Sequence, residues 1–166
     1  MKRSVMAVAL GVVVFGVLAM TAQAQESQRF VRFELAGDVS WGELVGEMVY
    51  PLSDAPYAGG RRTGESLALS GVALKAPVDP VQIFMTAFNF RSHISGEPAE
   101  CPALFLVPPS SIIGPGEAIV RPADTRSLHY EAEMVIVVGR EAINVSVEDA
   151  GDYVFGVSAG NDVSAR

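Results

Sequence analysis

Three carboxylates in the last third of the chain have the types and spacing to do chemistry. Glu131 and Glu133 stand two residues apart at the start of an apolar run, residues 134–138, and Asp162 follows a second apolar segment. Side chains two apart on a strand share a face, so Glu131 and Glu133 should project together. Adjacent anions near a core are costly unless a cation neutralises them. The pattern predicts a site for Mg²⁺, or for Mn²⁺ or Ca²⁺, which all favour oxygen ligands. The alternative is that both glutamates are solvated residues on a strand edge.

Short apolar segments separated by turn residues must position these side chains. The run at residues 134–138 is rich in β-branched residues and is closed by Gly139, which predicts a buried strand. Ser146 and Asp149 have a spacing like that of a capping box, which predicts one short helix. The expected strands are residues 30–35, 47–50, 81–87, 104–107, 112–113, 118–120, 134–138 and 154–157. With no long amphipathic helix, the pattern predicts a β-rich α+β fold.

A series of motifs follows in order along the second half of the chain. They are Asn89-Phe90-Arg91-Ser92-His93, Pro108-Pro109-Ser110-Ser111, Ile113-Gly114-Pro115-Gly116, Tyr130-Glu131-Ala132-Glu133 and Asn161-Asp162-Val163-Ser164-Ala165-Arg166. In this order they resemble the fumarylacetoacetate hydrolase family. The resemblance implies a mixed β-roll of that family's type, incomplete at the C-terminus and preceded by a small β-rich segment. The expected domains are a signal peptide at residues 1–24, an N-terminal β-rich segment at residues 25–76 and the first half of a catalytic domain at residues 77–166.

The resemblance also implies roles for particular residues. Its metal-binding strand corresponds to Glu131 and Glu133, with Asp162 as the third oxygen ligand. His93 is the expected general base, since an imidazole titrates near neutral pH and can take a proton from water and return it. Glu97 is its expected acidic partner. Asn89 and Arg91, which precede His93 in the same motif, are the expected substrate-binding residues.

The function implied is divalent-metal-dependent hydrolysis of a carbon–carbon bond in a small 1,3-diketo or acylpyruvate-type acid. Two alternatives stay open. One is a decarboxylase or isomerase acting on a 2-oxo acid, as in other members of the same family. The other is a truncated, non-catalytic domain that binds metal without turnover.

The chain departs from the family pattern at three places. Glu97 stands one residue beyond the usual acidic position, which Gly96 occupies, so Glu100 is an alternative partner for His93. Val107 stands where related sequences often carry lysine. The chain also stops at Arg166, inside a motif, which leads us to expect a fragment or a truncated relative. A bare edge on the last strand would favour pairing with a second chain, and we expect a homodimer.

The first residues of the chain carry a targeting signal. Lys2 and Arg3 precede an uncharged apolar stretch followed by Ala22-Gln23-Ala24, the pattern of a cleaved secretory signal peptide. The alternative is an uncleaved membrane anchor, because the apolar run approaches the length of a membrane span. We therefore expect a secreted or periplasmic protein without a stable membrane span after processing. Removing Lys2 and Arg3 lowers the formal net charge from −7 by two, to −9. An acidic surface argues against nucleic acid as a partner.

Overall fold

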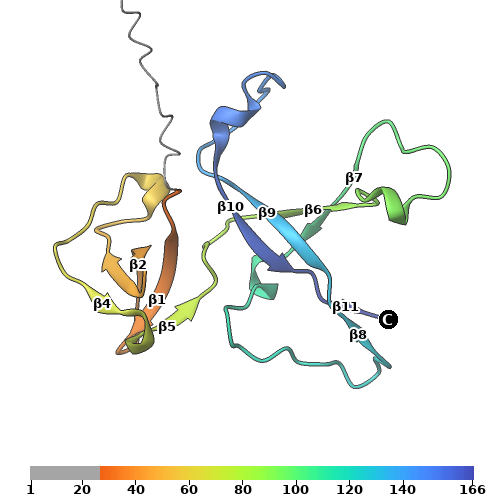
Figure 1. The fold of residues 1–166 in the computed structure, drawn as a ribbon. Helices are drawn as coiled ribbons and strands as arrows, with labels where there is room; N and C mark the ends of the chain where they lie inside the picture. The colour runs from red at the N-terminus through yellow and green to blue at the C-terminus, as the bar shows by residue number, and fades with distance from the viewer. Residues whose placement is uncertain (1–26) are drawn as a thin grey trace, which may run out of the picture.

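The computed structural model describes residues 27–166, so the signal peptide expected at residues 1–24 lies outside the described residues. The described residues form eleven β-strands and five short 3₁₀ helices, arranged as one five-stranded sheet and three two-stranded sheets (Figure 1). Every strand pair among them is antiparallel. Between residues 27 and 166, no helix is long and apolar enough to cross a membrane.

The N-terminal sheet contains five strands in the order β4-β3-β2-β1-β5. Its strands are β1 (Phe30–Leu35), β2 (Asp38–Val45), β3 (Met48–Pro51), β4 (Leu67–Ala68) and β5 (Ala73–Lys75), and its 3₁₀ helices are η1 (Pro56–Ala58) and η2 (Leu69–Gly71). The β1–β2 hairpin turns at Ala36 and Gly37, which both have positive φ, as a two-residue turn of this kind requires. The buried hydrophobic core of the described residues lies in this part of the chain and consists of Phe33, Val49, Leu52, Ala55 and Ala76.

The second half of the chain consists of three two-stranded antiparallel sheets. Its strands are β6 (Ile83–Ala87), β7 (Ala103–Val107), β8 (Leu128–His129), β9 (Ala132–Val138), β10 (Val154–Asn161) and β11 (Ser164–Ala165), and its 3₁₀ helices are η3 (Arg91–His93), η4 (Pro109–Ser111) and η5 (Ala150–Tyr153). β6 pairs with β7, β9 with β10, and β8 with β11. In Figure 1, β8 and β11 continue the β9–β10 hairpin at its open end. This extended hairpin carries the acidic motif.

Aromatic side chains join the N-terminal sheet to the β9–β10 hairpin. The ring of Phe155 on β10 lies 5.6 Å from that of Phe30 and 5.8 Å from that of Tyr57, measured between centroids. Tyr57 in turn meets the edge of Trp41 at 5.6 Å. Tilted and edge-to-face pairs at these distances are favourable beyond the area they bury. This cluster anchors β10, and through β10 the strand pair that holds the site.

Several expected strands are present and others are not. The predictions at residues 30–35, 47–50, 81–87, 104–107, 134–138 and 154–157 correspond to β1, β3, β6, β7, β9 and β10. The strands expected at residues 112–113 and 118–120 do not form, because the segment contains prolines, which lack a ladder donor, and Gly116 at φ +80°. The strands β2, β4, β5, β8 and β11 were not expected. The Ser146–Asp149 pair does cap a turn, since the Asp149 amide donates to Ser146 Oγ at 3.1 Å, and the 3₁₀ helix η5 follows.

The prediction that residues 134–138 form a buried strand is wrong in its burial. Met134, Ile136 and Val138 share one face of β9 and are 70%, 55% and 60% exposed. Phe84, Leu104 and Leu106 on β6 and β7 are likewise more than half exposed. The reason is that each of these sheets has only two strands, and no second layer formed by residues 27–166 covers these faces. The apolar composition of a strand indicates that one of its faces tends to be buried, but it does not indicate which segment buries that face.

Candidate functional site

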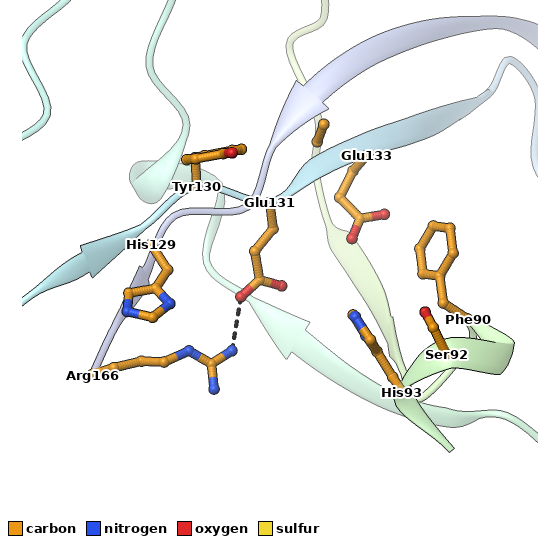
Figure 2. Close-up of a pocket in the computed structure, with 9 residues that line it drawn as sticks. Phe90, Ser92, His93, His129, Tyr130, Glu131, Glu133 and Arg166 are labelled. Atoms are coloured by element: carbon orange, nitrogen blue, oxygen red, sulfur yellow. Dashed lines mark hydrogen bonds and ion pairs between the residues drawn. The ribbon is translucent and has the colours of Figure 1, made fainter. Parts of the chain in front are cut away.

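A cavity of about 450 Å³ lies where the end of β8, the start of β9, the end of the chain and the η3 loop meet. Its walls combine two acids, two imidazoles, one guanidinium and two aromatic rings (Figure 2). The lining residues are Phe90, Ser92, His93, His129, Tyr130, Glu131, Ala132, Glu133 and Arg166. Three segments that are distant in sequence therefore form one polar site.

Strand alternation brings the two glutamates to this cavity. Figure 2 shows Glu131 and Glu133 projecting from the same side of the strand toward the loop that carries His93. The backbone at Glu131 is fixed from the opposite strand by two hydrogen bonds. Its amide donates to Asn161 Oδ1 at 3.0 Å, and its carbonyl accepts from the Asp162 amide at 2.9 Å. The position of Glu131 is thus set by the residues that end β10.

Glu131 is held as an anion. A hydrogen bond from Ser164 lowers the pKa of its carboxyl below the ordinary value, and the Arg166 guanidinium and the charge on His93 lower it further. Arg166 Nη2 donates to Glu131 Oε1 at 2.9 Å. An ionised carboxylate is the form that binds a metal cation.

The pKa of Asp162 shifts in the opposite direction. Burial raises the pKa of its carboxyl, and the negative charge of Glu131 raises it further. Asp162 is therefore close enough to Glu131 for the two anions to repel each other, although it does not line the cavity. A divalent cation between them would relieve this repulsion.

These residues fit a hard divalent cation in donor type. Glu131 and Glu133 open onto one cavity, and Asp162 supplies a third oxygen donor beside Glu131. As the side chains stand, no three His, Cys, Asp or Glu residues between positions 27 and 166 are grouped closely enough to hold a metal. The Arg166 guanidinium pairs with one oxygen of Glu131. The metal-ligand prediction stays a prediction.

Of the other expected site residues, one lines the cavity and three lie outside it. His93, at the end of η3, lines the cavity, and its ring centroid lies 5.9 Å from that of Phe90. Asn89 instead donates from Nδ2 to Thr86 Oγ1 at 2.8 Å. Neither Asn89, Arg91 nor Glu97 lines the cavity, and all three are exposed. Their expected roles remain predictions that this geometry does not support by itself.

Arg166 and Ser164 are the polar partners of Glu131 that sequence reasoning did not identify. Asp162, Ser164 and Arg166 are spaced by two residues, and β11 pairs Ser164 with His129 on β8. The same alternation that relates Glu131 to Glu133 therefore relates these three residues. The spacing of two residues predicts that Asp162, Ser164 and Arg166 share a face, but it indicates that they face Glu131 only once β11 is known to pair with β8.

Asp162→Asn should raise the thermal midpoint of the metal-free protein at neutral pH. Because the pKa of Asp162 is raised in the folded state, its ionised form destabilises the fold at pH values above that pKa. As the pH falls through the raised pKa toward the ordinary value near 4, Asp162 becomes protonated and the advantage of the variant should disappear. Thermal melts in EDTA at several pH values test this. An Asp162→Asn variant that is less stable than the wild type at pH 7 would contradict a raised pKa for Asp162.

Comparison with solved structures defines the class of fold. The crystal structure of 2-hydroxyhepta-2,4-diene-1,7-dioate isomerase from Mycobacterium marinum superimposes with a TM-score of 0.75 at 32% identity, covering 84% of this chain and 56% of that one. The β-rich fold with few helices is therefore that of the fumarylacetoacetate hydrolase type, as the sequence predicts. The family model described as fumarylacetoacetate (FAA) hydrolase C-terminal matches residues 82–166, and one described as Rv2993c-like, N-terminal, matches residues 28–77. The chain belongs to the fumarylacetoacetate hydrolase family.

Curated relatives support the same family assignment, and the chain covers only part of their length. Protein Rv2993c of Mycobacterium tuberculosis is 33% identical over 148 residues, which is 83% of this chain and 56% of that protein. The homoprotocatechuate catabolism bifunctional isomerase/decarboxylase of Escherichia coli is 40% identical over 87 residues, 51% of this chain and 20% of that protein. The chain thus spans about half the length of Rv2993c and less of the second relative. The family is one of enzymes and includes hydrolases, isomerases and decarboxylases.

Proposed function

We propose that this chain provides the metal- and base-bearing part of an enzyme that hydrolyses a carbon–carbon bond in a small 1,3-diketo or acylpyruvate-type acid. One observation carries the proposal: Glu131 and Glu133 line the same cavity as His93. Paired acids on one wall and an imidazole on the other supply an oxygen-ligand site and a proton acceptor within one polar site. Membership of the family adds that the chemistry concerns small organic acids.

Glu131, Glu133 and Asp162 would hold the cation, with Mg²⁺ as the first choice and Mn²⁺ or Ca²⁺ as alternatives. When bound, such a cation supplies a Lewis acid that stabilises negative charge developing on the substrate oxygens. Hydrogen bonds from Ser164 and Arg166 keep Glu131 ionised. Glu133 lines the cavity and carries no ion pair among the described residues.

His93 would act as the general base. Neutral imidazole takes a proton from a water molecule, whose oxygen attacks the carbonyl carbon of the substrate. The carbon–carbon bond then breaks, and its electron pair goes to the departing carbon of the 2-oxo acid as an enolate. The imidazolium returns the proton to that carbon. The position of His93 at the end of η3, on the wall of the cavity, supports this proposal.

Isomerisation or decarboxylation of a 2-oxo acid is the second candidate. It is favoured by the relatives that carry those names, at 40% and 32% identity. The same residues suit it, because both reactions pass through an enolate. An isomerase would use His93 to move a proton between carbons, and a decarboxylase would lose carbon dioxide in place of an acyl group.

Product analysis separates these reactions. The purified protein is incubated with acetylpyruvate and Mg²⁺ in water enriched in ¹⁸O. Hydrolysis should yield pyruvate and acetate, with one ¹⁸O atom in the acetate carboxylate. A parallel incubation with an unsaturated 2-oxo dicarboxylate tests for double-bond migration or release of carbon dioxide. Metal binding with no turnover of either substrate would overturn the catalytic proposal and favour a non-catalytic metal-binding domain.

A further inference from the structure

We infer that a second cavity of this chain binds a small zwitterion that carries an aromatic ring, the chemistry of a free aromatic amino acid. The second cavity lies where η1, the residue pair after β9, the end of η5 and the start of β10 meet, and its volume is about 290 Å³. That volume is close to the lower end of the usual range for ligand pockets, about 300–1,000 Å³. No residue that lines it lines the cavity of Glu131 and His93, so the inference does not depend on the proposed function.

A β-bulge shapes the wall that β10 contributes to the second cavity. Neighbouring side chains on a regular strand point to opposite faces, yet Val154 and Phe155 both line this cavity. Val154 pairs with Val138 across the hairpin. The next pair joins Gly156 to Val137, so the strand carries one extra residue at this point. Bulges redirect side chains in this way and are frequent beside functional sites.

Contacts within the chain hold the aromatic walls in place. The Gly139 amide donates to the Tyr153 carbonyl at 3.0 Å, and a Cβ at Gly139 would stand only 2.6 Å from Phe155 Cβ. The Phe155 ring meets the Tyr57 ring edge to face, with 5.8 Å between the centroids. Tyr57 and Phe155 nevertheless remain 38% exposed each. A ligand ring placed against them would remove further apolar surface from water.

Two opposite charges line the second cavity without pairing. The Arg140 guanidinium lies over the Tyr153 ring, 4.2 Å from its centroid. Asp152 lines the same cavity, yet neither Arg140 nor Asp152 forms an ion pair among residues 27–166. A guanidinium attracted to a ring by its charge keeps its N–H donors for a carboxylate, which it can bind with two parallel hydrogen bonds. The Asp152 carboxylate can likewise accept from an ammonium group.

An aromatic zwitterion matches all of these features at once. Its carboxylate would pair with Arg140, its ammonium group with Asp152, and its ring would lie against the aromatic walls. An anion without an ammonium group would be repelled by Asp152, and an amine without a carboxylate would be repelled by Arg140. Because both charged side chains are exposed, each pairing should change the affinity only about two- to fivefold.

A titration of the full chain with L-phenylalanine, followed by ¹H–¹⁵N NMR, tests the inference. The amide resonances of Gly139 and Phe155 should shift with a dissociation constant in the millimolar range, as expected for so small a ligand. The resonance of Glu133, in the other cavity, should not shift. 3-Phenylpropionate lacks the ammonium group and phenethylamine lacks the carboxylate, so each should bind about two- to fivefold more weakly than L-phenylalanine. L-Leucine, which has no ring, should also bind more weakly.

Matched variants assign the two charges. Arg140→Gln should weaken the binding of L-phenylalanine about two- to fivefold without weakening that of phenethylamine. Asp152→Asn should weaken the binding of L-phenylalanine to a similar extent without weakening that of 3-phenylpropionate. Arg126→Gln is the control, because Arg126 is exposed and lines neither cavity, and its affinity for L-phenylalanine should equal that of the wild type. Thermal melts establish that all three variants are folded.

Two results would overturn the inference. One is the absence of shifts at Gly139 and Phe155 with tens of millimolar L-phenylalanine, or shifts confined to Glu133 and its neighbours. The other is an equal affinity for L-phenylalanine in the wild type, Arg140→Gln and Asp152→Asn, because the charges would then take no part in binding.

Discussion

Replacing Glu131 with alanine should abolish the binding of divalent cations. Hydrogen bonds from Ser164 and Arg166 lower the pKa of Glu131, which lies just before β9, the strand that carries Glu133, and its carbonyl accepts a hydrogen bond from the Asp162 amide. Without Glu131, the two remaining carboxylates cannot surround a cation. Loss of groups that merely orient ligands costs 10- to 100-fold in metal affinity, so loss of a direct ligand should cost more than about 100-fold. Calorimetry with Mg²⁺ and Mn²⁺ on folded protein measures the change.

Two further variants make this result specific. Glu131→Gln preserves the shape of the side chain and should lose metal binding as Glu131→Ala does, since an amide oxygen carries no net charge. Glu141→Ala removes the same charge from an exposed residue that does not line the cavity, and its affinity should stay at the wild-type value. Equal affinity in wild type and Glu131→Ala would refute the metal site.

Replacing His93 with alanine should lower kcat by about 10²- to 10⁴-fold, the range for a positioned acid–base group. The affinity for Mn²⁺ should barely change, because His93 is on η3, whereas Glu131 and Glu133 lie just before and within β9. Steady-state kinetics at saturating acylpyruvate and calorimetry on the same sample separate the two effects. A variant with normal turnover would remove His93 from the mechanism.

His129 is the matched control for this experiment. It is the second histidine of the chain and lines the same cavity, but its Nε2 lies 3.3 Å from Ser127 Oγ, within the β8–β11 pairing. His129→Ala should therefore lower kcat much less than His93→Ala. If the two variants lose turnover equally, the proton transfer cannot be assigned to His93 alone.

The acidic wall of the site could be predicted from the sequence because it depends on local geometry. Glu131 and Glu133 share a face because neighbouring side chains on a strand alternate, and that alternation needs only the strand itself. The turn at Ser146 and Asp149 follows equally from two residues three apart. The family and its β-rich fold were recognisable for a related reason, since the order of short motifs is retained in the linear sequence.

Only the tertiary structure decided what surrounds those acids. The ion pair between Arg166 and Glu131 joins residues 35 positions apart, and it exists because β11 pairs with β8. The exposure of Met134 and Ile136 likewise depends on which other segments cover β9, and their apolar composition could not reveal this. Alternation and turn chemistry are fixed by neighbours in the sequence. Strand pairing, burial and the balance of charge in a cavity depend on distant segments, whose register no single stretch of sequence specifies.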